Sequence, residues 1–196
     1  MTEEPAARLY LLVPARIDAT TLAAALDGGD VACVLLTAAD TDSGALVRTA
    51  QDRQVAALVP DDPKLAQRLG ADGVHLSPGH TVKAARAALP DDRILGAACA
   101  TSRHEAMLAG EAGADYVAFA GRAGDPEASA DPEILRWWQT MMTLPCVAMG
   151  AIGLGDTGDM ARAGADFVAL GEAVWDHPDG PGAAVAEANR QLAGAG

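Results

Sequence analysis

The sequence is poor in aromatic and basic residues, and it has no long hydrophobic run. Phe, Trp and Tyr make up only 4% of the 196 residues, and 14 Lys and Arg stand against 27 Asp and Glu, for a net charge of −13. Proteins that bind the nucleic-acid backbone carry a basic footprint, so nucleic acid is not an expected partner. No stretch of about 18 apolar residues, the length that spans a bilayer, occurs in the sequence, so no membrane association is expected.

The cysteines are few and do not have the spacing of a metal site. Cys33, Cys99 and Cys146 each lie in or beside an apolar run, and their number is odd. This pattern predicts buried free thiols in a reducing compartment. The acidic start at residues 1–5 contains no apolar targeting segment, so we expect a cytoplasmic protein.

A Gly-Ala-Asp phrase recurs along the chain. Its aspartates are Asp72, Asp115 and Asp166, with a weaker copy at Asp30, and they are 42, 43 and 51 residues apart. Each copy ends a helix-like run with a glycine and opens a short apolar run that is typical of a buried strand. Each interval holds two strand-plus-helix units. Four copies therefore predict a single-domain α/β protein over residues 1–196, the (β/α)8 TIM barrel.

Apolar runs and helix-start residues place the expected elements. Strands are expected at residues 9–13, 31–37, 55–60, 73–77, 94–99, 116–120, 146–149 and 167–170. Helix starts are expected at Asp18 or Thr20, at Asp62, and at Thr101 or Ser102. The adjacent Trp137 and Trp138 fall in an expected helix. At helical spacing only one of the two rings points fully inward, so the pair packs against the barrel or against a second subunit. A homo-oligomer is therefore one of the two alternatives.

In a TIM barrel the repeated phrase falls at the amino-terminal ends of the strands, whereas active sites are built from the loops at the other end. The clearest chemical signal there is Gly150, Ala151 and Ile152, which face Gly171 and Glu172 across neighbouring loops. Small residues let backbone N–H groups approach an anion, and barrels often bind phosphate at this place. We predict a phosphate site, with plain tight turns as the alternative, although the Glu172 carboxylate opposes an anion.

Three polar residues in other loops are candidates for chemistry. Asp61 follows the third strand and suits either a magnesium ion or a helix start. His80 lies beyond the end of the fourth strand, so it is a better acid–base candidate than His75, which lies inside that strand. Arg122 falls in the longest loop, residues 121–130, where it either clamps a phosphate or is an ordinary solvated arginine.

Several segments resemble the thiamine-phosphate synthase family and its thiazole tautomerase relative. They are residues 59–66, 70–76, 94–96, 113–117 and 147–152, and the resemblance extends from Arg8 to Val174. It implies a TIM-barrel transferase that joins a pyrimidine pyrophosphate to a thiazole phosphate. In this family magnesium binds the pyrophosphate, whose loss leaves a pyrimidine cation that the thiazole nitrogen captures.

The chain departs from the family at several functional positions. The glutamine, arginine and lysine that hold the pyrophosphate correspond to Val34, Leu36 and Ala38. The resemblance keeps the first magnesium aspartate as Asp61 and places His80 at the second. The serine after the last strand corresponds to Glu172. These differences predict slow synthase turnover, because a pyrophosphate needs compensating cations or metal.

Three interpretations follow, in order of preference. The first is a thiamine-pathway enzyme of this family, either a diverged synthase or a tautomerase. The second is a non-catalytic barrel that binds a thiazole phosphate or another small phosphorylated ligand. The third is an unrelated barrel isomerase that uses Asp61, His80 or Cys99 as acid or base.

Overall fold

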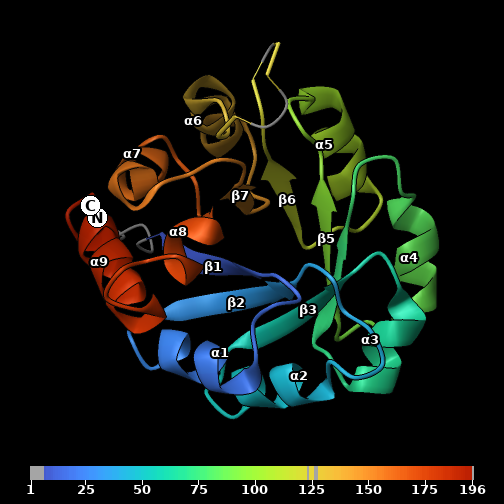
Figure 1. Ribbon diagram of the computed structural model, residues 1–196. Coiled ribbons are helices and arrows are strands. Elements are labelled where there is room, and N and C mark those ends of the chain that lie inside the picture. The colour runs from blue at the N-terminus through green and yellow to red at the C-terminus, as the bar shows by residue number, and fades with distance from the viewer. Residues whose placement is uncertain (1–6, 123, 126–127, 196) are drawn as a thin grey trace.

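The computed structural model describes residues 7–122, 124–125 and 128–195, which form a closed barrel of eight parallel strands surrounded by helices (Figure 1). The strands pair in sequence order, and the last strand pairs with the first. The predicted (β/α)8 TIM barrel is therefore confirmed. Within the described ranges, no helix has the length and apolar character needed to cross a bilayer.

Each strand begins and ends within one residue of its predicted position. The strands are β1 (Arg8–Val13), β2 (Val31–Leu36), β3 (Ala56–Pro60), β4 (Gly73–Leu76), β5 (Ile94–Ala98), β6 (Tyr116–Phe119), β7 (Cys146–Ala148) and β8 (Phe167–Leu170). The helices are α1 (Ala19–Leu26), α2 (Gly44–Gln51), α3 (Pro63–Leu69), α4 (Val82–Ala88), α5 (Arg103–Glu111), α6 (Pro132–Met141), α7 (Thr157–Arg162), α8 (Glu172–Trp175) and α9 (Pro181–Ala193), with a 3₁₀ turn η1 (Leu154–Asp156). In the outer ring, α9 packs against α1, α7 and α8, which closes the ring beside the first and last strands (Figure 1).

The helices begin at side chains that accept hydrogen bonds from the first turn. Asp18 caps α1, Asp62 caps α3 with Pro63 following it, and Ser102 caps α5. Each cap satisfies backbone N–H groups that have no partner within the helix. The helix-start interpretation of Asp62 is thus confirmed, and the open choices for α1 and α5 are decided in favour of Asp18 and Ser102.

The aspartates of the repeated phrase fasten neighbouring strands at the amino-terminal end of the barrel. Each carboxylate accepts a hydrogen bond from a backbone N–H near the start of the preceding strand. The bonds are to Asp72 from Ala57 (2.8 Å), to Asp115 from Leu95 (2.7 Å) and to Asp166 from Cys146 (2.8 Å). The fourth copy differs, because Asp30 binds the side chain of Arg8 at 2.7 Å. The repeat is therefore structural, as predicted.

A hydrogen-bonded row of rings crosses the barrel lumen. The hydroxyl of Tyr116 lies 3.0 Å from the hydroxyl of Tyr10 and 2.8 Å from Nδ1 of His75. A Cβ atom at Gly96 would lie 2.0 Å from the Tyr116 ring, so glycine is needed to admit that ring. All three rings are buried. Burial lowers the pKa of His75 to about 4 and raises the pKa of both tyrosines, so the row is uncharged at neutral pH.

A bulge at the start of β2 decides which of its side chains face the lumen. Leu9 pairs with Val31, but the next residue, Tyr10, pairs with Cys33, so Ala32 is the extra residue. Cys33 and Leu35 consequently pack with Tyr10 inside the barrel. The alternate residues Val34 and Leu36 belong to the outer layer between strands and helices. An inserted residue exchanges the two faces of a strand because side chains alternate with a period of two.

The aspartate bonds predict a measurable contribution to stability. Asp115→Ala should lower the free energy of unfolding by about 1–3 kcal/mol, because the Leu95 N–H loses its acceptor and Arg86, at 3.1 Å, loses its ion-pair partner. Urea denaturation would measure the loss. Asp91→Ala, at an exposed carboxylate, is the control and should change stability by less than about 0.5 kcal/mol. Equal losses in the two variants would contradict a specific role for the repeat.

The buried histidine predicts a pH dependence of stability. Because its pKa is about 4 in the folded chain and near the ordinary value of 6.5 when unfolded, His75 binds its proton more readily in the unfolded state. Its contribution is complete above about pH 6.5 and is lost as the pH falls toward 4, by up to about 3 kcal/mol. The free energy of unfolding, measured by urea denaturation between about pH 4 and 7, should fall less steeply with falling pH in His75→Gln than in the wild type. In His104→Gln, which changes an exposed histidine, it should fall as steeply as in the wild type. Identical slopes in the wild type and His75→Gln would refute the assignment.

Candidate functional site

The loops at the carboxyl-terminal ends of the strands gather around one mouth. Asp61 follows β3, His80 follows β4, and Gly150 and Gly171 follow β7 and β8. The repeated aspartates precede β4, β6 and β8 at the opposite end. The prediction that the two sets of residues lie at opposite ends of the barrel is confirmed. Barrel enzymes build their sites at the end that carries Asp61, His80, Gly150 and Gly171.

Asp61 forms a corner between the loops after β3 and β4. One carboxylate oxygen accepts the backbone N–H of Ser77 at 2.6 Å, and the other accepts its hydroxyl at 2.8 Å. The residue adopts a φ of 56°, a left-handed conformation that aspartate tolerates better than most residues. His80 lies beside it, with Nε2 3.6 Å from Asp61 Oδ1. The structure thus brings together two of the predicted site residues and adds Ser77.

This corner does not have the composition of a magnesium centre. Both oxygens of Asp61 are already engaged by Ser77, and the neighbouring side chain, His80, offers nitrogen rather than oxygen. Magnesium prefers near-octahedral oxygen ligands. Within residues 7–122, 124–125 and 128–195, no group of three His, Cys, Asp or Glu side chains is placed to hold a metal ion. The residues present do not fit a magnesium ion held by the protein alone, so we assign it no step.

The loop after β7 is shaped by a close approach of two backbones. Gly150 has a φ of 102°, and a Cβ atom there would lie 2.1 Å from the carbonyl oxygen of Ala128 in the loop after β6. Ala151 pairs with that same residue in a short bridge and is exposed. The Ile152 N–H donates to the Gly150 carbonyl at 2.8 Å, which makes a tight turn. Glycine is therefore required at position 150 for packing, whether or not an anion binds.

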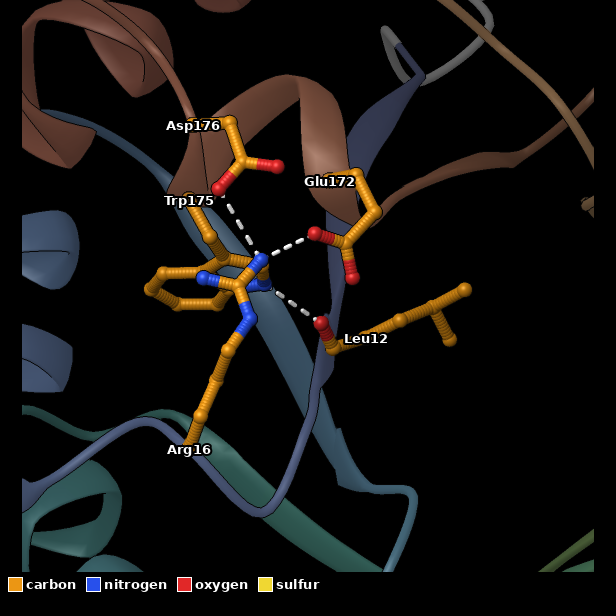
Figure 2. A network of polar contacts seen from close by, with 5 residues as sticks. All are labelled: Leu12, Arg16, Glu172, Trp175 and Asp176. Atoms are coloured by element: carbon orange, nitrogen blue, oxygen red, sulfur yellow. Dashed lines mark hydrogen bonds and ion pairs between the residues drawn. The ribbon is translucent and has the colours of Figure 1, made fainter.

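The loop after β8 is tied to the loop after β1 by an ion-pair network (Figure 2). The guanidinium of Arg16 lies between the carboxylates of Glu172 and Asp176, hydrogen-bonding to both, with Asp176 at 3.0 Å. Beside it, the Trp175 indole N–H donates to the backbone carbonyl of Leu12 at 2.6 Å. The one-turn helix α8 is thus attached to the end of β1 at two points.

This network occupies the guanidinium of Arg16 with two carboxylates. Arg16 is shared between Glu172 and Asp176, so the three groups together carry a net negative charge when all are ionised. The pairs are solvent-exposed, and exposed pairs are each worth only about 0–1 kcal/mol. A strongly binding anion could therefore compete for Arg16, but it would have to displace two carboxylates.

Arg122 lies in the loop after β6, which contacts Gly150 and Ala151 through Ala128. Its guanidinium donates to the hydroxyl of Ser129 at 3.2 Å. It lines a cavity of about 550 Å³ with Arg136 and Arg162 from helices α6 and α7. Sequence reasoning missed this grouping, since the three arginines are 14 and 26 residues apart and share no motif.

Cys99 and the lumen residues have no catalytic geometry. Burial raises the pKa of Cys99 to about 12, so its thiol is neutral and a poor base at neutral pH. His75 is packed against Tyr116 inside the barrel, as its position within a strand predicts. Of the predicted acid–base candidates, only Asp61 and His80 are adjacent at the mouth.

The family model and the sequence relatives agree on one family. A family model described as thiamine monophosphate synthase matches residues 9–174. The thiamine-phosphate synthase of Rhodospirillum centenum is 48% identical over 203 residues, covering 95% of this chain and 98% of that protein. The thiamine-phosphate synthase of Hyphomonas neptunium is 41% identical over 202 residues, covering 92% and 91%.

A solved structure supports the same fold. Thiamine phosphate pyrophosphorylase from Pyrococcus furiosus superposes with a TM-score of 0.82 at 24% identity, covering 96% of each chain. The matched residues, 9–174, take in all eight strands except Arg8 at the start of β1, and they agree with the extent of the resemblance seen in the sequence. The chain therefore belongs to the thiamine-phosphate synthase family and has a role in thiamine biosynthesis.

Proposed function

We propose that the protein binds a thiazole phosphate in its mouth and joins it to a pyrimidine pyrophosphate only slowly. The observation that carries this proposal is the network around Arg16, in which two carboxylates hold the arginine nearest the loop after β8. A pyrophosphate with about three negative charges needs cations or metal ions for compensation. Of the arginines at this mouth, Arg16 is already neutralised by two carboxylates.

The thiazole phosphate is placed between the loops after β7 and β8. Gly150, Ala151 and Ile152 form one side, and Gly171 and Glu172 form the other. Ala151 is exposed and carries no side chain that would exclude a phosphate. Glu172 is bound to Arg16, which reduces the repulsion that its free carboxylate would exert on an anion. Arg122 follows β6 and is the next arginine along this side of the barrel.

The side chains of β2 support slow turnover. By correspondence with the family, Val34 and Leu36 replace a glutamine and an arginine. In this barrel the bulge at Ala32 turns both of them outward and places Cys33 and Leu35 in the lumen. Neither Val34 and Leu36 nor Cys33 and Leu35 carry a charged donor for a pyrophosphate. Slow turnover is therefore expected whichever of the two pairs faces the lumen.

A thiazole tautomerase is the second candidate, and the contact between His80 and Asp61 favours it. An imidazole Nε2 at 3.6 Å from a carboxylate oxygen, at the edge of an open mouth, is suited to move a proton on a bound ring. Tautomerisation needs no pyrophosphate site. A product assay decides between the candidates, because a tautomerase leaves the pyrimidine pyrophosphate unconsumed.

Thiazole phosphate should bind saturably, and Ala151→Asp should weaken it at least about tenfold, because a carboxylate at this position repels the phosphate. Isothermal titration calorimetry would measure the affinity. Ala87→Asp, at an exposed alanine of α4, is the matched control and should bind as the wild type does. Absence of binding at millimolar ligand, or equal weakening in both variants, would remove the phosphate site from these loops.

The purified protein should form thiamine phosphate at least about a hundred to a thousand times more slowly than a family member that carries the full pyrophosphate set, since the loss of even one charge-stabilising donor typically costs that much. Thr37 is exposed and follows Cys33 and Leu35 at a spacing of two, so it lies on the lumen side of β2. Thr37→Arg should therefore supply a cation for the pyrophosphate and raise the rate. Arg48→Gln, remote on α2, should leave it unchanged. Ordinary synthase rates in the unmodified chain, measured with excess magnesium, would show that the pyrophosphate is held elsewhere.

A further inference from the structure

A concentration of positive charge lies outside the barrel, between α6 and α7. The cavity there measures about 550 Å³. Its lining consists of Arg122, Ser129, Pro132, Arg136, Asp156, Asp159, Met160, Arg162 and Ala163. Three of the 14 basic residues of a chain with a net charge of −13 therefore meet at one cavity.

The carboxylates of this cavity do not neutralise all three arginines. Arg162 is paired with Asp159 on the same helix. Asp156 accepts a hydrogen bond from the backbone N–H of Gly153 at 3.3 Å. In the part of the chain that the structure describes, neither Arg122 nor Arg136 has an ion pair with a carboxylate. With both aspartates ionised, the lining still carries one net positive charge.

We propose that this cavity binds a phosphoryl anion, either inorganic pyrophosphate or a phosphate monoester. Guanidinium groups bind phosphate oxygens through paired N–H donors, and the cavity presents two that no carboxylate occupies. The hydroxyl of Ser129, now bound to Arg122, is a further donor within the same lining. The neighbouring Asp156 and Asp159 disfavour larger polyanions, so the site takes an anion no larger than pyrophosphate.

The cavity is separate from the thiazole phosphate site but close to it along the chain. Arg122 begins the loop after β6, and Asp156 lies in η1 after β7, so both belong to loops at the mouth end of the barrel. Arg136 and Arg162 lie on the outer helices. An anion held here rests on the rim, outside the lumen. The inference does not depend on the proposed synthase or thiazole-binding activity.

Titration with inorganic pyrophosphate and with orthophosphate tests the proposal, with amide chemical shifts of the 19.9 kDa protein followed by NMR. We expect saturable shifts at α6 and α7 that weaken as salt is raised. Arg136→Gln should weaken pyrophosphate binding about tenfold, in line with the loss of a charge-assisted hydrogen bond. Arg48→Gln removes a matched exposed arginine, which has no ion pair with a carboxylate among the described residues, and it should have no effect.

The two sites are distinguished by crossing the variants. Ala151→Asp should leave pyrophosphate binding at α6 and α7 intact, whereas Arg136→Gln should leave thiazole phosphate binding intact. Both variants are checked by urea denaturation, and Arg136 is exposed, so its replacement should not unfold the chain. Three outcomes would overturn the proposal: no saturable shift at millimolar anion, equal weakening by Arg48→Gln, or loss of the pyrophosphate signal in Ala151→Asp alone.

Discussion

Carboxylates at the start of alternate strands hold the barrel together at its amino-terminal rim. Asp72, Asp115 and Asp166 each accept a backbone N–H from the neighbouring strand, a group that would otherwise lack a partner at the edge of the sheet. The closure of the sheet is therefore secured far from the mouth. Loops at the mouth can change their chemistry without losing the fold, because the bonds that close the sheet lie at the opposite end.

Much of this scaffold could be predicted because its signals are local. A helix cap such as Asp62 acts within four residues, and apolar runs reveal strands without reference to distant parts of the chain. The lumen could not be predicted in this way. Tyr10 and Tyr116 are 106 positions apart, and their contact depends on the barrel having closed. No glycine marks the position of the bulge at Ala32, so the sequence does not predict it.

The candidate site shows the same limit. The sequence identified the loops of the mouth correctly because they follow from the strand order. It left Asp61 open between a metal ligand and a helix-start residue, and the deciding partner, Ser77, is 16 residues away. The pairing of Arg16 with Glu172, 156 positions away, has no local signal in the sequence. Charge counts in a loop predict electrostatics only when the pairing of those charges is known.

The bulge in β2 also bears on how relatives of this chain are compared. Because one extra residue at Ala32 exchanges inward and outward positions, two proteins with nearly the same letters in this strand can present different side chains to a substrate. Insertion or loss of a single codon there would change the inner wall as thoroughly as several substitutions. In this strand the number of residues, rather than their identity, therefore decides which side chains face the lumen.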